Sequence, residues 1–135
     1  MATTLDTAIG KSVTSIPECL AAGYVDISSG LLLGIKTVDS HPSSVIELVA
    51  AATADLFQGQ NVSTIEAMFK KARGVEDGRH YFQEIIVNSD NLIHIFIRGR
   101  KYPDYISVFV SRNTVNLGMM LAKSRLAVPT FEDSI

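Results

Sequence analysis

The chain has little charge and only one cysteine. Charged residues make up 19% of it, below the usual quarter, whereas hydrophobic residues make up 47%. A surface with so few charges predicts that part of it is covered by another subunit. The single cysteine, Cys19, excludes an intramolecular disulfide. Its apolar neighbours predict a buried strand residue and not a reactive thiol.

A strong charge of either sign and a long apolar segment are also missing. The formal net charge is -2 and the sequence pI is about 5.9, which gives no general attraction to nucleic acid or to anionic membranes. The 135 residues contain no apolar run long enough for a membrane helix, and the first residues do not resemble a signal peptide. We therefore expect a single cytoplasmic domain that binds no nucleic acid and does not insert into membranes.

Motifs for catalysis and for binding metals or phosphate are missing as well. The histidines, His41, His80 and His94, show no spacing typical of metal ligands, and there is no cysteine pair, EF-hand loop or phosphate-binding glycine loop. The serines before Gly30 lack the flanking pattern of a nucleophile elbow. The sequence predicts no enzyme, no cofactor and no metal site.

What the chain does contain is a regular succession of helical and strand patterns. Apolar spacing predicts a helix over 4–15, capped by Thr3 or Thr4, and strands over 19–27 and 31–35 around a turn at 26–30. A helix over 42–57 follows, and a capping box at Ser63 and Glu66 predicts a short extra helix over 63–73. Strands over 81–87, 92–98 and 105–110 precede a helix from Thr114, which Pro129 ends, leaving a flexible tail at 128–135.

This order predicts an α+β sandwich, α-β-β-α-(α)-β-β-β-α, with one five-stranded antiparallel sheet and helices on its faces. Alternation places Ile93, Ile95 and Ile97 toward the core, while their neighbours indicate partial cover on the other face too. The extra helix would turn an inner face made of Ile65, Met68, Phe69 and Ala72 toward the body.

The helix over 42–57 has two apolar stripes, and its only charged residues are Glu47 and Asp55. An apolar surface this wide predicts contact with something other than water, either a second subunit or a larger core of its own. A basic cluster, Arg98, Arg100 and Lys101, is either a contact for an acidic or phosphorylated partner or a solvated turn that keeps a sheet edge soluble.

Three short segments, together with this element order, carry a resemblance. They are Ile16-Pro17-Glu18 before a strand of small residues, Asp26-Ile27-Ser28-Ser29-Gly30 in the hairpin, and Asn116-Leu117-Gly118 at the start of the last helix. With them the chain resembles the roadblock/dynein light chain family from about Leu5 to Leu126. The resemblance implies a profilin-like sandwich over 1–135 that forms a homodimer through its second helix and third strand, with a continuous sheet across both subunits. The implied interface residues are Val45, Ile46, Val49, Ala50, Thr53, Phe57, Tyr81, Gln83 and Ile85.

The same resemblance implies a function. Family members are non-catalytic platforms; some bacterial ones regulate small Ras-like GTPases by rearranging the GTPase's own residues, and eukaryotic ones scaffold motor or signalling complexes. We therefore expect a homodimeric interaction module whose partners are a second copy of itself and a small GTPase or another protein. The helix over 63–73 lengthens the usual passage between the second helix and the third strand, where it would cover part of the docking surface. The alternative is a small-molecule sensor of PAS or GAF type, with a pocket lined by Phe82, His94, Phe96 and Met119.

Overall fold

The computed structural model describes residues 3–38, 43–74, 80 and 82–135, and the side chains of 43–48 and 50 are outside this description. Its elements are α1 Thr4–Ser15, β1 Cys19–Asp26, β2 Leu31–Thr37, α2 Ser43–Gln58, α3 Gln60–Arg73, β3 Glu84–Asn88, β4 Leu92–Arg98, β5 Tyr105–Arg112 and α4 Leu117–Glu132. The strands form one antiparallel sheet in the order β2-β1-β5-β4-β3. This confirms the α+β sandwich.

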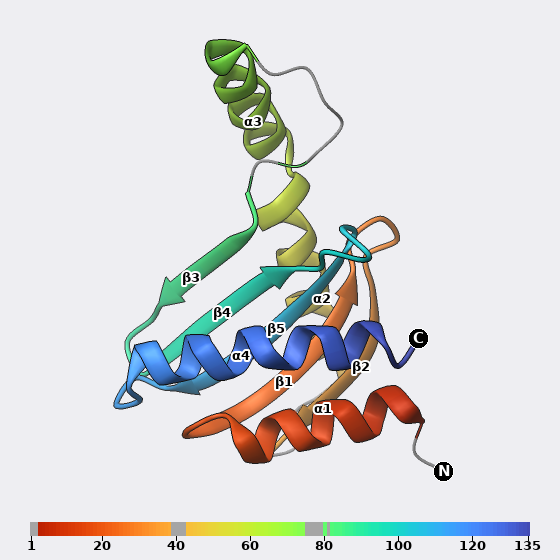
Figure 1. Ribbon diagram of the computed structural model, residues 1–135, viewed down its shortest axis with the longest axis vertical. Helices are drawn as coiled ribbons and strands as arrows, with labels where there is room; N and C mark the ends of the chain where they lie inside the picture. The colour runs from red at the N-terminus through yellow and green to blue at the C-terminus, as the bar shows by residue number, and fades with distance from the viewer. Residues whose placement is uncertain (1–2, 39–42, 75–79, 81) are drawn as a thin grey trace.

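The helices cover both faces of the sheet. Helices α1 and α4 lie side by side on one face, and α2 lies on the other (Figure 1). The core under α1 and α4 contains the isoleucines of β4, as alternation predicts, and Tyr24, Phe109 and Phe131. The smaller core under α2 is built around Phe57, Phe96, Ile106 and Val108. Cys19 is buried at 8% exposure.

The first hairpin owes its turn to one carboxylate. Asp26 accepts hydrogen bonds from the backbone N–H and hydroxyl of Ser28 and from the hydroxyl of Ser29. Gly30 has a φ of 73°, a backbone conformation that glycine adopts without strain. The turn after β1 is therefore confirmed, and it sets the register between β1 and β2.

Helices α2 and α3 are separated by a single residue, Gly59, so the extra helix begins earlier than its capping box predicts. The Gly59 N–H donates to the Asp55 carbonyl, and a Cβ at Gly59 would lie 2.7 Å from that oxygen, so the joint fits only glycine. The Ser63 hydroxyl donates to the Gln58 carbonyl instead of capping a helix. Helix α3 projects away from the rest of the molecule (Figure 1).

The predicted inner face of α3 is wrong. Ile65, Met68 and Phe69 are 42%, 64% and 45% exposed, whereas Glu66 is 6% exposed. The helix turns this charged residue inward because the Glu66 carboxylate contacts the Phe82 N–H and the His80 ring. Tertiary hydrogen bonds thus decide the orientation of this helix against its apolar pattern.

The last helix does not end at Pro129. It begins at Leu117, with the Asn116 side chain accepting from the Met119 N–H at 3.0 Å, and continues to Glu132. Proline inside a helix removes one hydrogen bond and crowds the carbonyl one turn earlier, and burial of Phe131 against Tyr24 and Phe109 offsets this cost. The predicted flexible tail at 128–135 is therefore wrong for its first residues.

Strand β3 is shorter than predicted, since it begins at Glu84, and Tyr81 lies outside the described residues. It pairs with β4 on one side, and no other described strand lies on its outer side. Among the described helices, none combines the length and the apolar character needed to cross a membrane.

Candidate functional site

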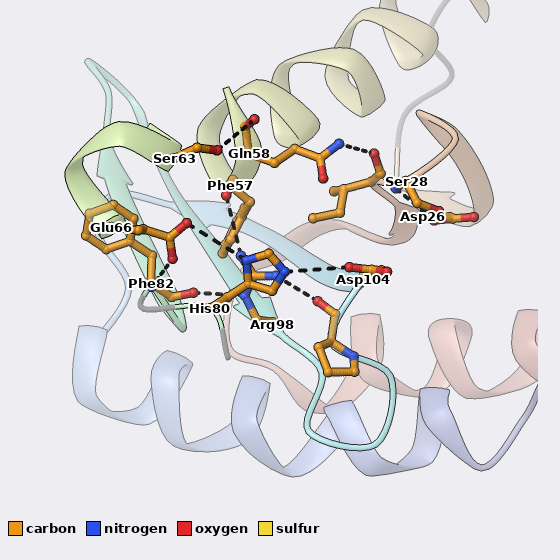
Figure 2. A network of polar contacts seen from close by, with 12 residues as sticks. Asp26, Ser28, Phe57, Gln58, Ser63, Glu66, His80, Phe82, Arg98 and Asp104 are labelled. Atoms are coloured by element: carbon orange, nitrogen blue, oxygen red, sulfur yellow. Dashed lines mark hydrogen bonds and ion pairs between the residues drawn. The ribbon is translucent and has the colours of Figure 1, made fainter. Parts of the chain in front are cut away.

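A polar network lies where α2, α3, the approach to β3, and the β4–β5 loop meet (Figure 2). Its centre is Arg98, the last residue of β4, which is 3% exposed. The guanidinium donates to three carbonyls: Phe82 at 2.9 Å, Pro103 at 2.9 Å and Phe57 at 3.5 Å. One side chain therefore ties together the end of α2, the segment before β3 and the β4–β5 loop.

The surroundings of the Arg98 cation act on its charge in opposite directions. Burial lowers the pKa of Arg98, while the charges of Glu66 and Asp104 act to raise it. An arginine keeps its proton even so. Arg98 is consequently part of the interior, and its prediction as a contact for a partner protein is wrong. The alternation of β4 placed Arg98 on the same covered face as Phe96, and that pattern was the signal for its burial.

Glu66 fastens α3 to the body. One carboxylate oxygen accepts from the Phe82 N–H at 3.0 Å, and the other lies 3.9 Å from Nδ1 of His80. The second ring nitrogen of His80 lies 3.9 Å from the Asp104 carboxylate. The Gln58 amide, at the end of α2, donates to the Ile27 carbonyl. The network thus fixes the α2–α3 joint on the sheet.

The β4–β5 loop is held from the other side by Glu132 at the end of α4. Glu132 is 5% exposed, and its carboxylate accepts from the N–H groups of Lys101 and Tyr102 at 2.8 Å each. The side chains of Arg100 and Lys101 are exposed on this anchored loop. Of the predicted basic cluster, these two remain candidates for a partner contact.

A polar groove of about 560 Å³ runs beside this loop, between α4 and the start of β3. Arg125 of α4 spans it with two hydrogen bonds to the Glu84 carboxylate, at 2.8 and 2.7 Å. These bonds hold the pKa of Glu84 below its ordinary value. Arg100 also lines the groove and lowers the same pKa.

The residues predicted for the dimer interface differ in exposure: some are accessible and others are fully buried. Val49 is 40% exposed, and Gln83 and Ile85 are half-buried near the sheet edge. Thr53 and Phe57 are fully buried within this chain, where the Thr53 hydroxyl donates to the Val49 carbonyl and Phe57 packs below Arg98, so neither is available to a partner. The side chains of Val45, Ile46, Ala50 and Tyr81 lie outside the described residues.

Sequence reasoning missed the most exposed part of β3. Ile86 and Val87 are 44% and 37% exposed on this edge strand. The apolar run over 85–87, next to a polar turn, was the signal available for it.

The pocket predicted for a sensor does not form as proposed. Phe96 is 7% exposed and packs against Phe57 and His94 on the α2 face. Met119 lies on α4, which covers the opposite face, and is 54% exposed. The four predicted residues therefore line no common cavity. In the described ranges, no group of three or more histidine, cysteine, aspartate or glutamate residues is arranged to hold a metal ion.

No family model and no curated protein matches the sequence. Solved structures do match it. MglB from Thermus thermophilus, described as a gliding protein, superposes with a TM-score of 0.71 at 16% identity, over 96% of this chain and 87% of that one. A roadblock/LC7 domain from Streptomyces avermitilis superposes with a TM-score of 0.69 at 13% identity, over 95% and 94%. The chain has the roadblock fold.

The expected resemblance is thereby confirmed at the level of the fold. Myxococcus xanthus MglB matches this roadblock fold with a TM-score of 0.71 at 14% identity, over 97% of this chain and 94% of that one. Profilin II from Acanthamoeba castellanii matches with a TM-score of 0.59 at 12% identity, over 97% and 99%, in agreement with a profilin-like sandwich.

Proposed function

We propose that this protein is a non-catalytic docking platform that self-associates through β3 and α2 and regulates a small Ras-like GTPase. The observation that carries the proposal is the open edge of the sheet at β3, with Ile86 and Val87 exposed along it. The segment 85–87 contains no charged residue and no proline, and such an apolar edge is a template for pairing with another strand. A second copy of β3 would extend the sheet across two subunits.

The polar network supports this proposal because it fixes the two elements that would meet the second copy. Arg98 binds the carbonyls of Phe57, at the end of α2, and Phe82, two residues before β3. The network therefore holds the end of α2 and the start of β3 in a fixed position relative to each other. A preorganised surface loses less conformational entropy on association.

The regulatory half of the proposal rests on the fold and on the loop that carries Arg100 and Lys101. Three of the matching structures are MglB proteins, and the resemblance of this sequence to the roadblock family implies GTPase regulation by docking. Arg98 donates all its hydrogen bonds inside the subunit, so it is not an arginine supplied to a GTPase. Arg100 and Lys101 would instead contact an acidic surface of the partner.

Sedimentation velocity at micromolar concentration tests self-association. Val87→Lys should convert a dimer to a monomer, because a charge on each β3 would be brought close to its copy. Leu33→Lys is the matched control: it lies on the other edge strand, β2, and has similar exposure, 39% against 37%. A monomeric wild-type protein, or dissociation by Leu33→Lys alone, contradicts the proposed interface.

Nucleotide turnover tests the regulatory role. GTP hydrolysis and nucleotide exchange by small GTPases from the same organism are measured with and without the protein, and one of them should change at least tenfold for the true partner. The double variant Arg100→Glu, Lys101→Glu should lose this effect while remaining a dimer. An unchanged rate for every such GTPase overturns the regulatory role but leaves self-association standing.

A further inference from the structure

A second cavity, of about 340 Å³, lies between α2 and the sheet. Strands β1, β2, β4 and β5 form its floor, and Val49 of α2 lies over it. It is separate from the Arg98 network, since none of the network residues lines it.

The described residues of α2 differ in burial along the helix. Thr53 and Phe57, in the second half of the helix, are fully buried, whereas Val49 is 40% exposed. Opposite Val49, β1 contributes Ala21, which has only a methyl group, and Gly23, which has no side chain, so these residues leave space unfilled. The sheet surface there is only partly covered, because Leu20, Ile35, Leu92 and Val110 are half-buried.

The chemistry of the lining is almost wholly apolar. No charged side chain is among its described lining residues, and the polar ones near the start of β4 are Asn91 and His94. Burial lowers the pKa of His94, which favours the neutral imidazole. A neutral imidazole both donates and accepts a hydrogen bond.

We propose that this cavity binds a small, neutral, largely apolar molecule, with one polar group of the ligand hydrogen-bonded to His94 or Asn91. Its volume falls at the lower end of the range for small-molecule pockets. A helix or strand of a partner protein needs more space. Water gains few hydrogen bonds in an apolar cavity, so an apolar ligand displaces it at little cost.

This inference stands apart from the proposed function, since it needs neither a dimer nor a GTPase. It adds a consequence for α2, however. A ligand between Val49 and the sheet would add contacts to α2, so ligand binding should reduce amide hydrogen exchange in the turns of the helix on either side of Val49.

The test uses N-phenyl-1-naphthylamine, a neutral aromatic amine whose fluorescence rises in apolar surroundings. Titration of the full chain should give a saturable signal with one site per chain. Ala21→Phe should weaken binding at least tenfold because it fills the cavity. Ala8→Phe is the matched control, since Ala8 lines the groove between α1 and α4 on the other face and this variant should bind normally.

A direct measurement on the wild-type protein removes any dependence on how the variants fold. Nuclear Overhauser contacts should join the probe to the His94 ring and to the methyl groups of Val110. Absence of saturable binding overturns the inference, as do contacts to the Ala8 groove alone or binding that Ala21→Phe leaves unchanged in a folded protein.

Discussion

The guanidinium of Arg98 lies over the ring of Phe57, 5.1 Å from the ring centroid, and donates to the carbonyl oxygen of the same residue. One residue ends the strand β4 and the other lies one position before the end of α2. The contact combines a cation–π interaction with a hydrogen bond in a buried place, where both are stronger than at the surface. It joins the sheet to the helix that the proposed dimer would use.

Arg98→Met should lower the free energy of unfolding by about 2–4 kcal/mol, because it keeps most of the volume but leaves buried carbonyls without donors. The stability of Arg98→Lys should lie between those of Arg98→Met and the wild type, since an ammonium keeps the charge but lacks the planar fork that reaches separate carbonyls. Urea unfolding monitored by circular dichroism measures both. A change below about 0.5 kcal/mol in Arg98→Met, the usual size for a surface site, would contradict the central role of Arg98.

Glu66→Ala should release α3 without unfolding the sheet. The variant loses the acceptor for the Phe82 N–H, so the amides of residues 60–73 should exchange with solvent at least tenfold faster, while those of β4 and β5 keep their protection. Glu66→Gln is the control, because its amide oxygen can still accept that hydrogen bond. Equal exchange in α3 for wild type and Glu66→Ala, measured by mass spectrometry, would show that other contacts hold the helix.

Phe131→Ala should cost about 3–5 kcal/mol of stability, because its ring is fully buried against Tyr24 and Phe109. Ile135→Ala, at a residue that is 50% exposed, should change stability by less than about 0.5 kcal/mol. Thermal unfolding of the two variants compares them directly. Similar melting temperatures would mean that the end of α4 frays, as the sequence alone predicts.

Stability should fall in mildly acidic solution through His94. Because burial lowers its pKa in the folded state, the unfolded chain binds its proton first as the pH falls. Stability is therefore fully present above the ordinary histidine pKa of about 6.5 and is lost as the pH drops from there through the lower folded value. His94→Gln should flatten this dependence between about pH 7 and 5 in urea unfolding. An unchanged slope in His94→Gln contradicts the assignment.

Local patterns were sufficient for most of the architecture. The spacing of apolar residues identified α1, α2 and the strands, and the Asp26 and Gly30 turn chemistry identified the first hairpin. These predictions succeed because periodicity and turn preferences depend on neighbouring residues only. The prediction for β4 succeeds for the same reason, since strict alternation divides its side chains between two covered faces.

The failures lie where a distant part of the chain outweighed a local signal. A proline such as Pro129 normally stops a helix, but burial of Phe131 between α4 and the sheet carries the helix past it. The apolar pattern of α3 predicted an inward face with Ile65 and Met68, but the partners of Glu66 on the body turn the helix the other way.

The sequence by itself determined the order of elements, the scarcity of charge and the lack of a catalytic motif. Only the tertiary structure decided that Arg98 is an interior crosslink, that Arg100 and Lys101 stay exposed, and that a cavity lies between Val49 of α2 and the sheet. The physical reason is that burial of a charge and the space left between elements are set by residues far apart in the chain. The packing of these distant residues depends on many weak contacts, and no local sequence pattern specifies them.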